Sequence, residues 1–251
     1  MAEQILYDTE DHKVVLFEEL TPASAVEANQ YLIIHKGEGI LLDPGGHKVF
    51  AKLKSDISKY LPPQQIKYIF LSHQDPDIVA GINGWLLTTN AEALIPKLWY
   101  RFLPHFGLES RYEERVIPID DKGTRVNLNG CELLVLPAHF MHSPGNFQLY
   151  DPCSKILFSG DLGASLNQPY TIVENFEEHV KYMEGFHRRY MASNKVLRFW
   201  ANMVRQLDIE IIAPQHGAIF KGKDMVNKFI EWVENLECGV DLMTQEMYSI
   251  P

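Results

Sequence analysis

The sequence has 251 residues, a hydrophobic content of 46%, a charged content of 22% and a formal net charge of -10. These values are typical of a folded globular chain, and the acidic balance excludes a nucleic-acid backbone or an anionic membrane surface as the main partner, because both require a basic face. No window reaches the roughly 18 apolar residues that a membrane-spanning helix requires, so we expect one large domain over residues 1–251.

The first half of the chain is predicted to alternate strands and helices. Apolar residues 31–34 and 40–42 flank a turn-forming segment, 36–39, which indicates a β-hairpin. The other elements predicted here are a strand over 12–20, a helix over 47–60, a buried strand over 66–72, a helix over 78–90, a short strand near 93–96 and an irregular aromatic segment over 98–115.

The second half returns to strands and ends in helices. The predicted elements are strands over 115–119, 124–138 and 147–161, with turns at 127–130 and 151–152 dividing the last two segments, then a helical region over 176–207, a buried strand over 209–217 and a closing amphipathic helix over 222–243. The one basic cluster, residues 187–189, is predicted to be a solvated helix face. This order of elements predicts an α/β fold in which helices cover the outer faces of the sheets.

The three cysteines, Cys131, Cys153 and Cys238, lie far apart and form no C-x-x-C pair. The first residues are polar and lack the apolar core of a signal peptide. We therefore expect a cytoplasmic, reducing location in which each cysteine is a small buried apolar residue.

Four segments share one pattern, in which an apolar strand ends and a metal-ligand type follows at once: "IFLSHQDPD", "LLVLPAHFMHSPG", "ILFSGD" and "IIAPQHG". Strand ends in a layered α/β protein converge on one edge. The side chains expected to meet there are His73, Asp75, Asp77, His142, Asp161 and His216. Burying three carboxylates together without a cation is strongly unfavourable, and a mixed nitrogen and oxygen set suits iron, zinc or manganese.

These motifs, together with "NQYLII" and "GILLDPGG", resemble the metallo-β-lactamase-fold superfamily over nearly the whole chain. The resemblance implies a four-layer αββα sandwich. Within the superfamily, the sequence is most similar to the di-iron domain of flavodiiron proteins and to stand-alone oxygen-binding di-iron proteins.

The resemblance also implies a ligand set: His73, Asp75 and His142 on one iron, Asp77 and His216 on the second, and Asp161 bridging both. The family pattern usually reads His-x-Glu-x-Asp-His, so Asp75 replaces a glutamate and Ile78 replaces a histidine. The second metal site is therefore expected to lack one nitrogen donor. His139 is a candidate replacement ligand or a hydrogen-bonding support for a ligand, and a core role is equally open.

By this resemblance the chain is a non-haem di-iron protein that binds or reduces O2, with NO as an alternative ligand, as an oxygen sensor or a slow reductase. The chain leaves no room for a flavodoxin-like domain after the last ligand, so FMN is not expected in it. Electrons would then come from a separate redox protein, or a signalling protein would respond to O2 binding. A homodimer is one alternative for the oligomeric state.

Two other functions remain open. The first is a hydrolase in which zinc-bound water attacks a thioester, lactone or phosphodiester. Hydrolases of this fold more often carry His-x-His-x-Asp-His, which disfavours that alternative. The second is a signalling or scaffold domain whose metal site is residual.

The aromatic segment "LWYRFLPHFG" is expected mainly to pack in the core. Its alternative role is a lid in which Tyr100, Phe102 and His105, together with Ile78 of the ligand loop, wall the metal cleft. An apolar wall would favour a small uncharged ligand.

Overall fold

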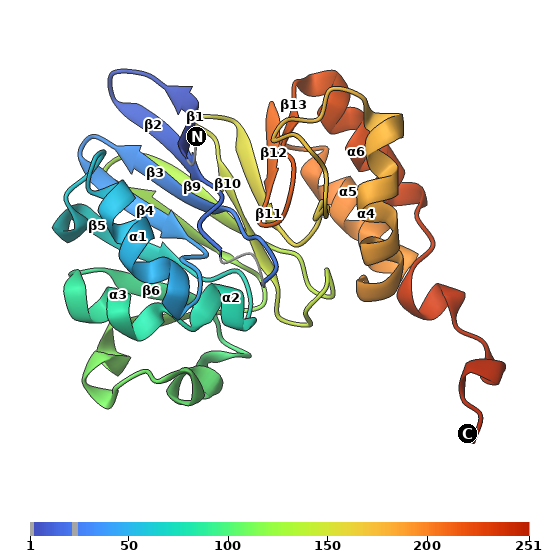
Figure 1. The fold of residues 1–251 in the computed structure, drawn as a ribbon, viewed down its shortest axis with the longest axis horizontal. Helices are drawn as coiled ribbons and strands as arrows, with labels where there is room; N and C mark the ends of the chain where they lie inside the picture. The colour runs from blue at the N-terminus through green and yellow to red at the C-terminus, as the bar shows by residue number, and fades with distance from the viewer. Residues whose placement is uncertain (1–2, 22–24, 251) are drawn as a thin grey trace.

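The structure, a computed structural model, describes residues 3–21 and 25–250. Two β-sheets pack face to face, and helices cover both outer faces, with α1 to α3 on one side and α4 to α6 on the other (Figure 1). This is the predicted four-layer αββα sandwich. Within the described residues, none of the helices has the length and apolar character needed to cross a membrane.

The first sheet contains seven strands that pair in sequence order. They are β1 (Glu3–Asp8), β2 (His12–Phe17), β3 (Gln30–His35), β4 (Glu38–Leu42), β5 (Ile66–Phe70), β6 (Glu92–Pro96) and β7 (Val116–Ile119). Pairing is antiparallel from β1 to β4 and parallel from β4 to β7. The predicted hairpin joins β3 to β4 through Lys36 and Gly37, whose φ values of 46° and 81° suit a two-residue turn.

The second sheet contains six strands in the order β13-β12-β11-β10-β9-β8. They are β8 (Thr124–Leu128), β9 (Cys131–Pro137), β10 (Phe147–Asp151), β11 (Ile156–Gly160), β12 (Ile211–Pro214) and β13 (Phe220–Lys221). Only β11 and β12 pair in parallel. As a result β9, β11 and β12 run in the same direction and place their carboxyl ends at one edge of the sandwich.

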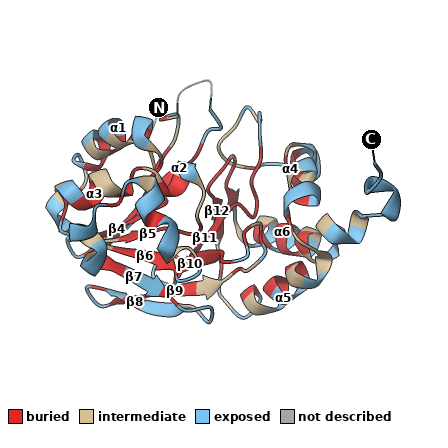
Figure 2. Ribbon diagram, turned by 90° about the horizontal axis from the view of Figure 1, so that it is seen from below, coloured by how far each residue is buried: buried red, intermediate tan, exposed pale blue. Residues whose placement is uncertain are grey.

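Among the described residues, six α-helices flank the sheets: α1 (His47–Ile57), α2 (Pro76–Val79), α3 (Ile82–Thr88), α4 (Phe176–Tyr190), α5 (Asn194–Val204) and α6 (Lys223–Asn235). One apolar cluster fills the space between the sheets, a second lies under α1 and α3, and a third lies under α4, α5 and α6. The strands are accordingly mostly buried, while the helices expose their outer faces (Figure 2). Burial of these three apolar faces is the main favourable contribution to folding.

Several predicted elements differ from the structure. The single helix predicted over 78–90 is two helices, because the backbone bends at Gly81 to donate a hydrogen bond to the carbonyl of Gly45 at 3.1 Å. A Cβ at Gly81 would lie 2.7 Å from that oxygen, so the approach requires glycine. The helical region over 176–207 is also two helices, and α6 ends at Asn235 instead of residue 243. Strands β1 and β13 were not predicted.

The expectation that each cysteine is simply a small buried apolar residue is wrong for two of them, which form a disulfide with each other. Cys131, the first residue of β9, forms a disulfide with Cys153 in the turn after β10. Antiparallel pairing of β9 with β10 brings the two together although they are 22 residues apart in sequence. Cys238 is free and buried, as predicted.

Candidate metal centre

All six predicted ligand side chains follow the carboxyl ends of strands. His73, Asp75 and Asp77 lie on the loop after β5 and the first turn of α2; His142 lies on the loop after β9, Asp161 directly after β11 and His216 after β12. They meet at one edge of the sandwich, which we call the ligand edge. Asp77 and the side chain of Asp75 are partly exposed, whereas His73 and Asp161 are buried.

One half of this group is built around His142. Its Nε2 lies 3.3 Å from Oδ2 of Asp75 and 3.0 Å from Oδ2 of Asp161. Nε2 of His73 lies 3.7 Å from both Asp75 and Asp161. Each of these four residues therefore offers one ligand atom, and these atoms all lie within 4.8 Å of one another.

The other half is built around His216. Its Nε2 lies 3.3 Å from Oδ2 of Asp77 and 3.7 Å from Oδ1 of Asp161. Asp161 therefore approaches both halves: its Oδ2 faces His142, and its Oδ1 lies 3.7 Å from both His73 and His216. The site thus has one shared carboxylate. On one side of it lie three ligand residues, His73, Asp75 and His142, and on the other side lie two, Asp77 and His216.

Backbone and hydroxyl groups orient the imidazoles. Nδ1 of His216 donates to the carbonyl of Glu27 at 2.7 Å, which leaves the Nε2 lone pair facing the site. Nδ1 of His73 lies 2.9 Å from Oγ of Ser72. The amide of Ser72 in turn donates to Asp43 at 2.8 Å, which fixes the start of the ligand loop.

Sequence reasoning missed Asp43, which appears there only within the motif "GILLDPGG". It is buried, and burial raises the pKa of its carboxyl to about 6 against the opposing hydrogen bond from Ser72. Its position just after β4, at the same edge as the ligands, is the signal that could have found it.

The charges of the six side chains stabilise one another. Burial alone would lower the pKa of His142, but its hydrogen bonds with Asp161 and Asp75 raise it to about 10. His216 behaves alike: Asp77 and Asp161 outweigh burial and raise its pKa to about 9. Conversely, burial would raise the pKa of Asp161, and the nearby imidazoles bring it down to about 2.

Two buried polar atoms at the centre of the group lack a hydrogen-bond partner among the described residues: Nε2 of His73 and Oδ1 of Asp161. They are 3.7 Å apart, too far for a hydrogen bond. Both are ordinary metal-ligand atoms, and a cation between them would satisfy both. The residues therefore fit a bound metal ion.

His139 is not placed as a replacement ligand. Its Nε2 lies 2.7 Å from the carbonyl of Asp121, and its ring packs edge-on against Phe147 at 5.2 Å. That hydrogen bond occupies Nε2, while Nδ1 is buried without a hydrogen-bond partner among the described residues. His139 is not part of the close group formed by His73, Asp75, His142 and Asp161, and it does not line the cavity beside them.

A cavity of about 700 Å³ opens onto five of the six side chains. Its apolar wall includes Val26, Leu166, Phe186 and Tyr190, and its rim carries His47 and Lys48 from the start of α1. The rings of Phe186 and Tyr190 stack at 4.7 Å and stand edge-on to His142 at 6.4 and 5.9 Å.

The aromatic segment does not form a lid over this cavity, whose aromatic wall comes from α4 instead. Tyr100, Phe102 and His105 lie on a 3-10 segment, Tyr100–Phe106, and do not line this cavity. Tyr100 packs against the apolar cluster under α1 and α3, and Ile78 is wholly buried in the same cluster. Core packing, the main expectation for the aromatic segment, is correct for Tyr100, whereas the wall role expected of Ile78 is wrong because its side chain packs in the core and does not line the cavity.

Comparison with known proteins gives consistent matches. The family model described as "ODP family beta lactamase" matches residues 26–217. A solved structure titled "Peroxy diiron species of chemotaxis sensor ODP" is 44% identical, covers 99% of this chain and 100% of that one, and has a TM-score of 0.88. A flavo di-iron protein mutant from Thermotoga maritima is 20% identical with a TM-score of 0.76, covers 92% of this chain and 60% of its own, and shows the fold alone.

Among curated proteins, an uncharacterised protein of Methanocaldococcus jannaschii is 28% identical over 214 residues, which are 82% of this chain and 53% of that protein. The chain thus spans about half the length of this relative.

Proposed function

The chain belongs to the ODP family of beta lactamase proteins, and from this premise we propose that it is a non-haem di-iron protein that binds O2. It acts as an oxygen sensor or as a slow reductase that takes electrons from a separate protein, and NO is the alternative small ligand. The supporting observation is the convergence of three imidazoles on the Asp161 carboxylate, with two further carboxylates, Asp75 and Asp77, beside them. We treat residues 1–251 as one di-metal domain.

In this proposal His73, Asp75 and His142 hold one metal, Asp77 and His216 hold the second, and Asp161 bridges the two. The distances of each imidazole from its nearest carboxylates support this division. The second site has a single nitrogen donor, His216, because Ile78 has no donor atom where the family pattern has a histidine. We expect it to bind its metal more weakly than the first.

The donor set favours iron, with zinc and manganese as alternatives. Imidazole and carboxylate suit all three metals, and the group contains no thiolate. Two bound iron ions would supply the capacity to bind O2 and to transfer electrons to it.

The chain's own residues select the ligand and exclude water. Phe186 and Tyr190 cover His142 from one side, and the apolar wall disfavours charged ligands while admitting a small neutral one. The hydrogen bond from His216 to the carbonyl of Glu27 keeps that imidazole in the tautomer whose Nε2 lone pair faces the site.

We place the protein in the cytoplasm with a soluble redox or signalling partner. A disulfide is unusual in that compartment and, where present, is commonly redox-sensing. The Cys131–Cys153 bond is thus expected to open there under reducing conditions.

Metal analysis combined with an oxygen-dependent absorption spectrum tests the proposal. Protein produced in iron-replete medium is expected to contain about two irons per chain, as for other di-metal sites of this donor type, and to gain a near-ultraviolet band when O2 is admitted to the anaerobic ferrous protein. Zinc with esterase activity would instead support the hydrolase, and protein without metal would support a scaffold.

A further inference from the structure

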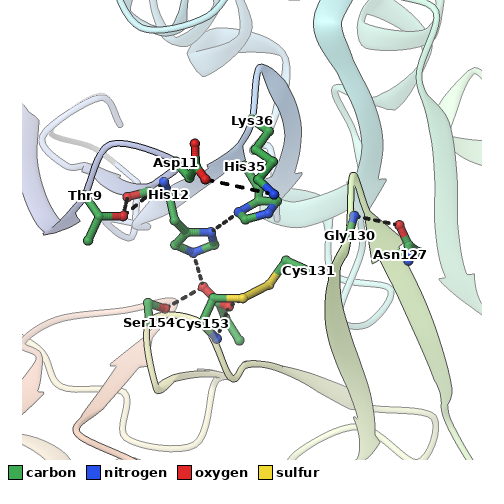
Figure 3. The surroundings of a disulfide bond; sticks show 11 residues. Thr9, Asp11, His12, His35, Lys36, Asn127, Gly130, Cys131, Cys153 and Ser154 are labelled. Carbon is green, nitrogen blue, oxygen red and sulfur yellow. Dashed lines mark hydrogen bonds and ion pairs between the residues drawn. A yellow bond between two sulfur atoms is a disulfide. The ribbon is translucent and has the colours of Figure 1, made fainter.

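A second group of metal-ligand side chains lies at the opposite edge of the sandwich, which we call the disulfide edge (Figure 3). His12 begins β2 of the first sheet; Cys131 begins β9 and Asp151 ends β10 of the second, and Cys153 lies in the turn that follows. Each of the four offers one ligand atom, and these atoms all lie within 4.8 Å of one another.

The contacts within this group are short and mostly buried. Nε2 of His12 lies 2.7 Å from Oδ2 of Asp151, and both residues are buried. Sγ of Cys131 lies 3.6 Å from Oδ1 of the same carboxylate. The carboxylate also accepts hydrogen bonds from Oγ of Ser154 at 2.5 Å and from the amide of Cys153 at 2.9 Å.

Reduction of the disulfide would change the electrostatics of this pocket. It would leave two thiols beside a buried carboxylate, where ionising them to thiolates adds like charge and is favourable only with a bound cation. Two sulfurs, one imidazole nitrogen and one carboxylate oxygen are a complete tetrahedral zinc set, and thiolates select zinc over the harder metals.

We propose that, when the Cys131–Cys153 bond is reduced, His12, Asp151 and the two cysteines bind one Zn²⁺, and that the disulfide is the metal-free state of the same site. His35 supports this role: its Nδ1 lies 3.1 Å from Nδ1 of His12. His35 can accept a hydrogen bond from Nδ1–H of His12 at that nitrogen, which leaves Nε2 of His12 for the metal.

The two states interconvert by a balanced exchange. A dithiol reductant gives two electrons and two protons to the S–S bond, becomes a disulfide itself, and leaves two cysteine thiols. Zn²⁺ then binds as the thiols release their two protons. In the reverse direction a small-molecule disulfide takes up the two electrons, the S–S bond forms again and Zn²⁺ leaves.

The two states would join different parts of the fold. The disulfide links two residues of the second sheet and its turn, whereas Zn²⁺ would bond His12 of the first sheet to the second sheet. The redox state would therefore determine whether a coordinated metal ion links the two sheets at this edge.

Cobalt titration tests the inference on the full chain. The protein is reduced with a phosphine, stripped with a chelator and titrated anaerobically with Co²⁺. A thiolate-to-cobalt charge-transfer band distinguishes this site from the ligand edge, where the described residues offer no thiolate. We expect the band in the reduced protein and its absence in the oxidised protein.

Matched variants separate this site from the proposed di-iron centre. Cys131→Ser and Cys153→Ser are expected to lose the band, whereas Cys238→Ser, which alters the free buried cysteine, keeps it. His142→Ala is expected to keep the band while lowering iron content. Failure of the di-iron proposal would therefore leave this result unchanged.

A measurement on the unaltered chain covers the case in which the cysteine variants do not fold. Zn²⁺ added to the reduced protein is expected to protect Cys131 and Cys153 from alkylation, as mapped by mass spectrometry. A reduced protein that gives no charge-transfer band, or one in which Zn²⁺ leaves the alkylation of both residues unchanged, would overturn the inference.

Discussion

The two edges of the sandwich gather the same kinds of side chain and satisfy them differently. At the ligand edge, Oδ1 of Asp161 is buried with no hydrogen-bond partner among the described residues, and a cavity of about 700 Å³ lies beside it. At the disulfide edge, Asp151 is wholly buried and bonded by His12, Ser154 and the amide of Cys153. Unsatisfied ligand atoms beside a cavity indicate a site prepared for a ligand, whereas a satisfied carboxylate indicates a closed structural state.

The largest effect on the ligand edge is expected from a substitution at Asp161. Asp161→Asn removes the carboxylate that both halves of the ligand edge share, so both proposed metals lose a ligand. We expect metal affinity to fall by more than the roughly 100-fold that loss of an outer hydrogen-bond partner causes. Bound iron measured after gel filtration should drop to background.

The matched control for this substitution is Asp120→Asn. Asp120 is exposed and pairs with Lys97 at the surface. Its variant is expected to retain full metal content. If Asp161→Asn also retained both metals, the division of ligands around Asp161 would be incorrect.

The disulfide edge is expected to respond in stability and not in iron content. Asp151→Asn breaks the buried pair with His12 at 2.7 Å, and loss of one partner of a buried pair costs about 3 kcal/mol of unfolding free energy. Chemical denaturation of the oxidised protein measures the loss. Asp8→Asn, at a half-exposed carboxylate paired with Lys13, should change stability by less than about 1 kcal/mol.

A loss of stability only at low pH is expected from a buried histidine near the ligand edge. His187 is buried; its Nδ1 donates to the carbonyl of Met183 at 2.7 Å and its Nε2 accepts from the amide of Gly163 at 2.8 Å. Protonation of Nε2 would set its N–H against the N–H of Gly163 and break this hydrogen bond. Burial accordingly lowers the pKa of His187 to about 4.

The sign of the pH dependence follows from that pKa. Between the unfolded value near 6.5 and the folded value near 4, the unfolded chain binds a proton that the folded chain does not. The stability contributed by neutral His187 is thus complete above pH 6.5 and is lost as the pH falls toward 4. Relative to His187→Gln, metal-free wild-type protein should lose about 3 kcal/mol across this window. A loss of equal size in both proteins would contradict this role, and His105→Gln should behave as wild type.

His187 also shows where sequence patterns mislead. It was grouped with Arg188 and Arg189 as a solvated helix face, yet it faces inward on α4 while the two arginines end the helix at its surface. A histidine among basic residues carries no local signal of its burial. The deciding partner, the amide of Gly163, comes from a loop 24 residues away.

The parts that could be predicted are those with a local physical signal. Alternating strand and helix patterns specified the layers, and the ligand residues stood out because each directly follows an apolar strand. The missed features depend on contacts across the fold: the Cys131–Cys153 pairing requires the β9–β10 register, and the Phe186–Tyr190 wall requires the position of α4 over His142. Sequence spacing alone contains neither.

The smallest expected effect concerns the asymmetry within the ligand edge itself. Ile78→His restores the nitrogen donor that the second metal site lacks by comparison with the family pattern. One added imidazole is expected to tighten the weaker metal by roughly tenfold, equivalent to about 1.4 kcal/mol. Equilibrium titration of the second metal measures the change.

The same substitution also places a polar ring where Ile78 is wholly buried in the cluster under α1 and α3. The metal-free variant should therefore be destabilised by about 1–3 kcal/mol, the usual cost of burying a polar group without a partner, and metal should recover much of this loss. Val79→His separates the two effects, because Val79 is equally buried beside it. Val79→His should lose stability with no gain in metal affinity. If both variants gained metal affinity, the position of the added imidazole would not matter. The proposed second site would then be incorrect.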